Sequence, residues 1–175
     1  TKAHVYQSKK EYDRALDIYQ SIVGLSKNYP RTYARVLTNF AKTKWLQNPN
    51  YPAKEEFLTA LQIRRNQQDS WGLNASYGHL ADFYISVNVD SSIYYGNELL
   101  NIATYLKSPD DELDALAKLI PLSNHDLALR YFTRYQFLSD SLLTARNNAK
   151  NQFALIRYNT EKYKADRLIL QKENA

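Results

Sequence analysis

Four small residues recur along the chain at nearly equal intervals: Ala15, Ala53, Ser92 and Ala128 lie 38, 39 and 36 residues apart. Each opens a similar short pattern, in which larger side chains follow about four and seven positions later. Self-similarity at a period of a few tens of residues is typical of repeat arrays, in which each unit buries its apolar face only by stacking on the next. The spacing therefore predicts an array of repeats, and such arrays serve as binding surfaces more often than as catalysts.

The composition indicates that these repeats are helical. With only 4 Gly and 5 Pro among 175 residues, the chain has few turn residues and favours long regular elements. Fifteen Tyr and 6 Phe supply the large side chains that fill the space between paired helices. The absence of Cys excludes disulfides and thiolate metal sites. No run of about 18 apolar residues occurs, so we expect no membrane span within these residues.

Apolar periodicity and turn signals divide the chain into helices. The clearest helix start is Ser108, followed by Pro109 and three acidic residues, where we expect the serine to cap the helix and the acids to complement its dipole. The predicted helical segments are 2–25 (two pieces with a turn near 9–11), 31–47, 53–68, 70–86, a helix that follows a turn and N-cap at 88–91 and runs to about 106, 108–119 and 126–175.

The last of these segments is unusual, because 126–175 contains neither Gly nor Pro. An unbroken helix of this length would span about 75 Å. Its apolar residues follow steps of three and four that indicate a weak heptad seam, interrupted by polar residues. The seam consists of Leu142, Ala145, Ala149, Phe153, Ile156, Thr160, Tyr163, Arg167, Leu170 and Asn174.

Two interpretations of this helix stay open. The segment either folds back on the array as an amphipathic helix, or it associates with a second copy to form a homodimer or continues into a longer coiled coil. The whole excess of basic residues lies in 130–175, where 9 Lys and Arg face 4 Asp and Glu. A basic helix suits an anionic partner or a membrane surface, but a solvated helix face is the simpler explanation.

The residues of the second unit resemble the tetratricopeptide repeat, which pairs large and small residues in a first helix with small, aromatic and small residues in a second. That unit carries Phe40 and Ala41, then Ala53, Phe57 and Ala60, at the family's offsets. The other units match more loosely, through Ala3, Tyr6, Ala15, Tyr19 and Ile22 in the first, Leu80, Ala81, Tyr84, Ser92, Gly96 and Leu99 in the third, and Leu119, Ala128, Phe132 and Tyr135 in the fourth.

The resemblance implies an all-α superhelix of about four helix-turn-helix units over 1–143, the first of them truncated, and an extended helix over 144–175. Segments 139–142, 149–158, 160–162 and 170–174 are further similar to the end of repeat domains in Bacteroidetes two-component sensors and related membrane-anchored regulators. In that family the helix leads to a coiled coil, a membrane span and an output domain. Since Thr1 falls within a helical pattern, we expect the chain to be a piece of such a longer protein.

The resemblance thus implies a non-catalytic sensor domain on the periplasmic side of the inner membrane, which binds a protein or peptide partner. The alternatives are a cytoplasmic scaffold without a membrane partner, and a regulator with a DNA-binding output. We expect no contact with nucleic acid, because no recognition motif is present.

The sequence offers little support for catalysis. His4, His79 and His125 lie in different units without metal-ligand spacing, and neither a phosphate-binding loop nor a nucleophile motif occurs. Acidic residues 110–112 are typical of a helix N-terminus. We therefore predict no enzyme activity, no metal and no cofactor.

Binding is the better prediction, because first helices line the concave face of the resembled fold. The positions carried over to that face are Arg35, Asn39, Lys42, Trp45, His79 and Asp82. The basic residues suit an acidic or carboxylate-bearing peptide, and Trp45 offers an apolar anchor. Alternatively, Trp45 packs between units and the polar residues are ordinary surface. The carboxylate clamp of chaperone-binding members is not reproduced, because Ala75 and His79 stand where basic residues are needed.

Overall fold

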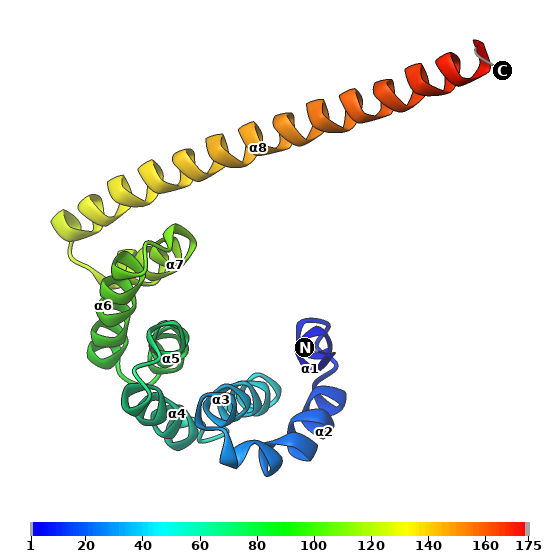
Figure 1. Cartoon of the computed structure of the whole chain (residues 1–175). Coiled ribbons are helices and arrows are strands. Elements are labelled where there is room, and N and C mark those ends of the chain that lie inside the picture. Colours follow the sequence, from blue (N-terminus) through cyan, green and yellow to red (C-terminus); the bar gives the residue numbers. More distant parts are fainter. Residues whose placement is uncertain (1, 174–175) are drawn as a thin grey trace. The chain divides into compact units, whose positions relative to one another are not determined.

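The computed structural model describes residues 2–173, and the side chains of these residues except 165, 166 and 168–173. All the regular elements of this part of the chain are helices, as the composition and periodicity predict (Figure 1). They are α1 Lys2–Ser8, α2 Tyr12–Val23, η1 Leu25–Asn28, α3 Pro30–Gln47, α4 Lys54–Asn66, α5 Ser70–Tyr84, α6 Val89–Tyr105, α7 Pro109–Leu119, η2 Ile120–Leu122 and α8 His125–Glu173.

The contacts between residues divide the chain into two units, 1–135 and 136–175. The first holds α1 to α7 and the beginning of α8, and the second consists of the rest of α8. The boundary predicted from the sequence lies between 143 and 144, because it is placed at the end of the last repeat. It stays a prediction.

Within the first unit, each helix packs against the next one along the chain from α1 to α7. The odd-numbered helices α3, α5 and α7, called first helices below, also contact one another, α3 with α5 and α5 with α7. Figure 1 shows α1, α3, α5 and α7 along the inner side of an arc, with α2, α4 and α6 on its outer side. The first unit is therefore a stack of antiparallel helix pairs with one face made by first helices.

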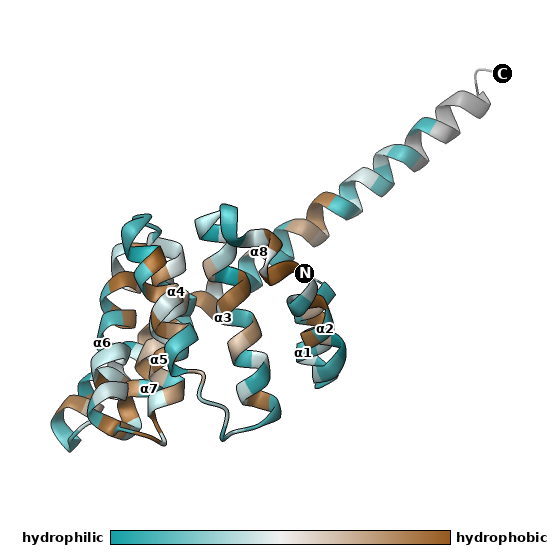
Figure 2. Cartoon of the chain, turned by 90° about the horizontal axis from the view of Figure 1, so that it is seen from below, coloured by the Kyte–Doolittle hydropathy of each residue, from teal (hydrophilic) through white to brown (hydrophobic). Residues whose placement is uncertain are grey.

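The core of this stack consists of the residues that recur in the sequence. Ala15, Ala53 and Ser92 are buried, as are the aromatic residues Tyr19 and Phe57 that follow the first two of them. The largest apolar cluster joins α3 to α7, with Phe57, Leu80 and Leu99 among its members. Figure 2 shows the matching pattern, in which these helices alternate apolar and hydrophilic faces. The small residues lie at 0 to 2% exposure because neighbouring helices approach closely there.

The fourth unit departs from the predicted pattern. Ala128 and Tyr135 are only half-buried, and Phe132 is 45% exposed. Ile22 of the first unit is also partly open, at 36%. In a repeat array the positions of one unit are covered by the next, and for the fourth unit no further helix pair follows α8 within residues 1–135. A match to the repeat pattern therefore overestimates how deeply the side chains of the last unit are buried.

Three of the predicted helix starts are present, but one is capped differently from the prediction. Asp69 and Asn88 accept hydrogen bonds from the backbone N–H groups of Gly72 and Ser91, at 3.0 and 2.8 Å. The hydroxyl of Ser108 instead donates to Asp111 Oδ2 at 2.5 Å, and makes no capping bond to the backbone. The hydroxyl is a donor in this bond, whereas a capping serine accepts from the backbone, so the Asp111 carboxylate orients the side chain without replacing the cap.

Candidate functional site

The surface formed by the first helices carries polar side chains, some of which meet between neighbouring helices. Lys42 of α3 places its Nζ 3.4 Å from Nδ1 of His79 on α5. The His79 ring stacks on Phe57, with centroids 6.1 Å apart and planes at 28°. Since α3 and α5 pack side by side, residues 37 positions apart in the chain meet here. We call the side chains of Arg35, Lys42, His79, Asp82 and Lys118 the inner surface.

Burial and charge decide the protonation of the inner surface. Burial, with the positive charges of Lys42, Arg64 and Lys118, lowers the pKa of His79 to about 3. The imidazole is therefore neutral at pH 7, and its Nδ1 can accept a hydrogen bond from the Lys42 ammonium. Burial also lowers the pKa of Lys42, although Asp82 and Asp114 oppose this effect.

Asp82 is tied to a residue that sequence analysis did not select. Lys118 Nζ of α7 lies 2.6 Å from Asp82 Oδ1 and 2.9 Å from Asp114 Oδ1. Burial disfavours the charge of Lys118, but the hydrogen bonds to both carboxylates outweigh burial and raise its pKa. A signal was present, because Lys118 follows Asp114 by four positions and Asp82 by 36, which is close to the repeat period.

The other predicted residues have different surroundings. Trp45 is half-buried against the largest core cluster and meets the edge of Phe83, with ring centroids 5.7 Å apart. This is the packing role that the sequence left as the alternative. Asn39 is half-buried, and its backbone carbonyl accepts a hydrogen bond from Thr43 at 2.7 Å. Arg35 is exposed and lines a separate groove.

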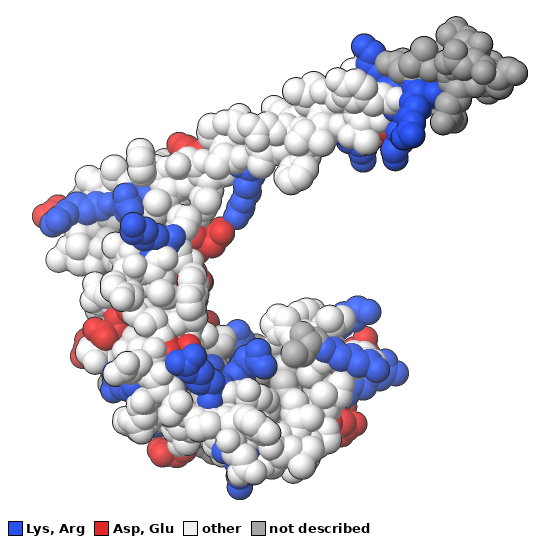
Figure 3. Space-filling model, in the orientation of Figure 1, with Lys and Arg blue, Asp and Glu red and all other residues white. Residues whose placement is uncertain are grey.

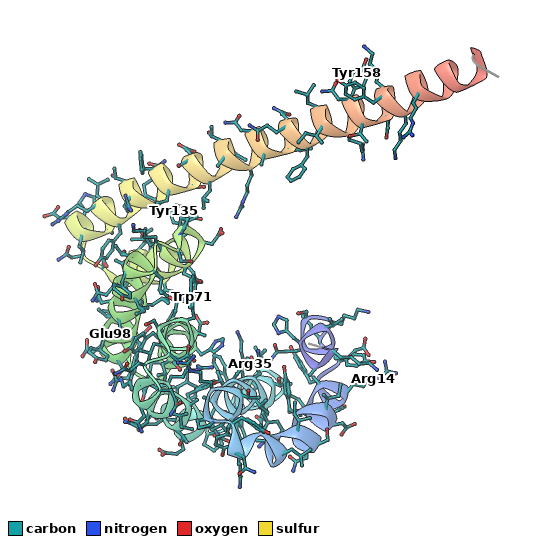
Figure 4. The ribbon with its side chains drawn as sticks, in the orientation of Figure 1. Arg14, Arg35, Trp71, Glu98, Tyr135 and Tyr158 are labelled. Carbon is teal, nitrogen blue, oxygen red and sulfur yellow. The ribbon has the colours of Figure 1, made fainter. Side chains whose placement is uncertain are left out.

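That groove has a volume of about 390 Å³ and lies among α3, the end of α4 and the start of α5. Gly72 and Ala75 bring no large side chain to it, which leaves space between α3 and α5. Figure 4 labels Arg35 and Trp71, both on the inner side of the arc, whereas Glu98 lies on its outer side. We call this the arginine groove; its lining residues are Arg31, Thr32, Arg35, Arg64, Asp69, Trp71, Gly72 and Ala75.

Arg64 is the buried member of the groove. Its side chain is 3% exposed and donates from Nη1 to Ser76 Oγ at 2.6 Å. Burial and the nearby Arg35 lower its pKa, although Asp69 opposes them. Sequence analysis missed Arg31, Arg64 and Trp71; an arginine within the apolar stripe of helix 53–68 was the available signal.

Among the residues that the structure describes, no cluster of His, Asp or Glu side chains is placed to hold a metal ion. The acidic residues at the start of α7 have other partners, since Glu112 is buried and accepts a hydrogen bond from Arg134 at 3.0 Å. What the described arrangement offers is a fixed set of charges and donors on one surface, which is the chemistry of recognition.

Comparison with known proteins supports the helical architecture. No protein-family model and no curated protein matches the chain. One similar solved structure is the crystal structure of BtubC (BKLC) from P. vanneervenii, with a TM-score of 0.60 and 19% identity. The match covers 85% of this chain and 61% of that one, so the chain spans less than two thirds of BtubC. Separately, none of the described helices combines the length and apolar character that a membrane span requires.

Proposed function

We propose that this chain is a non-catalytic protein-interaction domain of the tetratricopeptide type, which binds a peptide or protein on its inner surface. We further propose that it belongs to a membrane-anchored signalling protein of the two-component type, with the domain on the periplasmic side. The long helix α8 would then carry the binding signal toward the output. The fold and the distribution of polar groups support the first proposal, and the sequence resemblance of the tail supports the second.

The observation that carries the binding proposal is the bonding between successive first helices. Lys42 of α3 contacts His79 of α5, and Asp82 of α5 contacts Lys118 of α7. These contacts hold charged side chains in place before any partner arrives, which reduces the entropy lost on binding. Figure 3 shows Lys and Arg atoms gathered along the inner edge of the arc near α3 and α5.

Selection from a random-peptide display library tests this proposal. The wild-type domain is expected to enrich a family of related peptides. Arg35→Glu, on the inner side of the arc, is expected to abolish their binding. Lys54→Glu makes the same change of charge on α4, the second helix of the same pair, and is expected to retain it. Failure to enrich any peptide, or equal loss in both variants, would contradict binding on the inner surface.

The relay proposal has its own test in the full-length protein. A proline within α8 removes a backbone donor and breaks the helix. Asn151→Pro is therefore expected to leave peptide binding intact while abolishing the response of the output domain to the peptide. Asn151→Ala, which preserves the helix, is the control. An unchanged response in the proline variant would exclude the relay and favour a scaffold that acts through binding alone.

A further inference from the structure

The arginine groove has more positive charge than its own residues neutralise. Arg31, Arg35 and Arg64 line it together with one acidic residue, Asp69, which leaves an excess of two positive charges. Among the described residues, neither Arg31 nor Arg35 forms an ion pair with an acidic side chain, although Arg31 donates to the Gln67 carbonyl at 3.1 Å. One carboxylate oxygen of Asp69, Oδ1, already accepts a hydrogen bond from the backbone N–H of Gly72.

A buried donor in the same groove is unsatisfied. The Nε atom of Arg64 is buried without a hydrogen-bond partner, while the side chain as a whole is 97% shielded from solvent. A buried guanidinium donor without a partner is costly, and such groups are rare in folded proteins. Arg64 lies inside the fold beside a second cation, Arg35, and Asp69 is the one acidic side chain of the groove that offsets their two charges.

The aromatic residue at the rim defines the other half of the site. Trp71 lines the groove and is 61% exposed, which is high for a large apolar side chain. Its ring offers an apolar surface next to the arginines. A ligand that suits both features has an anionic group bonded to a chain with apolar side chains, as in a peptide.

We propose that the arginine groove binds a phosphoryl group carried by a peptide, with an apolar residue of that peptide against Trp71. A phosphomonoester carries a charge of about −1.5 to −2 at pH 7 and three acceptor oxygens. It thus matches the excess charge of the groove, whereas a carboxylate of charge −1 would leave one cation unpaired. Guanidinium groups bind phosphate oxygens through paired, charge-assisted hydrogen bonds. This inference rests on the proposed function, since the groove lies on the peptide-binding side.

Calorimetric titration of the intact chain tests the proposal with three capped peptides that differ at one position. Each has the sequence Gly-Gly-Leu-X-Leu-Gly-Gly, where X is phosphoserine, glutamate or serine. Inorganic phosphate is the fourth probe. We expect the phosphoserine peptide to bind at least about tenfold more tightly than the glutamate peptide, because more charge-assisted hydrogen bonds form. The serine peptide is expected to bind more weakly still.

Variants locate the binding in the groove. Arg35→Gln removes an exposed arginine and is expected to cancel the preference for phosphoserine. Arg130→Gln removes the same charge at an exposed position of α8 outside the groove and is expected to preserve it. Arg64 is buried, so Arg64→Lys is preferred to a neutral substitution; it keeps the charge, loses the planar fork and is expected to reduce the preference.

The outcomes separate this inference from the proposed function. Equal affinity for phosphoserine and glutamate peptides, or a preference that survives Arg35→Gln, would overturn the phosphoryl site while leaving peptide binding intact. Inorganic phosphate that binds as tightly as the phosphopeptide would overturn the role of the peptide and of Trp71. If neither phosphate probe binds, the inference is wrong, and the display selection still decides whether other peptides are recognised.

Discussion

Glycine at position 96 allows α6 and α7 to approach closely. A Cβ atom placed on Gly96 would lie 2.8 Å from Leu119 Cδ2 and 3.2 Å from its Cγ, and Leu119 is 1% exposed. Because the leucine cannot move into solvent, Gly96→Ala is expected to lower the free energy of unfolding by about 1–3 kcal/mol through overpacking. Urea unfolding followed by circular dichroism measures this loss.

Gly78 provides the matched control for Gly96. It is also a buried glycine within a helix, but its added Cβ would meet Leu99 Cδ2 at 3.7 Å, an ordinary contact. Alanine costs less backbone entropy than glycine in a helix, so Gly78→Ala is expected to raise the free energy of unfolding by about 0.5–1 kcal/mol. The same sign of change for both variants would show that contact with Leu119 is not the deciding factor.

The neutral imidazole of His79 gives the fold a dependence on pH. Its pKa is about 3 in the folded chain, against about 6.5 when unfolded, so the unfolded state binds the proton more readily. Stability from this group is complete above pH 6.5 and is lost as the pH falls toward 3. At pH 5 the loss relative to pH 7 is about 2 kcal/mol.

Urea unfolding at pH 7 and pH 5 tests this dependence. The difference between the two free energies of unfolding is expected to shrink in His79→Gln, since glutamine does not titrate. The charges facing His79 come from Lys42, Arg64 and Lys118. His4→Gln, at an exposed position of α1, is the control and is expected to keep the wild-type difference. A difference unchanged by His79→Gln would contradict the proposed burial of the neutral ring.

At the scale of elements, three helix ends share one turn geometry. Lys10, Gln68 and Lys107 have positive φ angles of 62°, 48° and 53° after α1, α4 and α6. The residue after each donates its N–H five positions back, as Ser108 does to the Ala103 carbonyl at 2.9 Å. This is the Schellman ending, which usually has glycine at the left-handed position. The chain thus makes its sharp turns with few glycines, at the expense of backbone strain.

Relief of that strain is predicted for Lys107→Gly. A side chain in the left-handed region costs roughly 1–2 kcal/mol, part of which the greater unfolded-state freedom of glycine offsets. We expect the free energy of unfolding to rise by about 0.5–1 kcal/mol. Lys107→Val should lower it instead, because a β-branched residue is least tolerated at positive φ. Thermal unfolding of both variants checks the pair, and a destabilised glycine variant would contradict the assignment of the turn.

At the scale of the whole molecule, the second unit exposes apolar side chains along α8. Phe153, Ile156 and Tyr163 of the predicted seam are 72, 60 and 76% exposed. The seam residues Leu170 and Asn174 lie outside the described side chains. Apolar side chains at steps of three and four along a helix are the contacts of a coiled coil. The homodimer that the sequence left as one of its alternatives would bury these side chains, and it stays a prediction.

We therefore expect the chain to be a dimer in solution, and to become a monomer when residues 144–175 are removed. Sedimentation equilibrium measures both masses. Ile156→Asp is expected to break the dimer, because Ile156 lies on the seam. Leu155→Asp is the control, since Leu155 is equally exposed at 60% but lies off the seam. Monomers in every case would leave α8 without a partner and would remove the support for the relay.

The sequence predicted the helices and most of the core, for a local reason. Residues that repeat at helical spacing and are small, such as Ala15 and Ala53, are those at which two helices touch, so pattern and burial coincide. The prediction failed at Phe132, where the pattern continues but no helix pair follows within residues 1–135 to cover it. It failed also at Ser108, whose hydroxyl donates to Asp111 and accepts no capping hydrogen bond from the backbone.

The site could be predicted only in part, because its contacts join residues that are distant in the chain. Position along the first helices was enough to select Lys42, His79 and Asp82. The pairing of Asp82 with Lys118, and the meeting of Arg35, Arg64 and Trp71 in one groove, depend on which helices pack side by side. The repeat period and the composition are properties of each segment alone, and they were enough to determine an all-helical stack. Tertiary packing decided which charges face one another, because electrostatic interaction depends on distance in space.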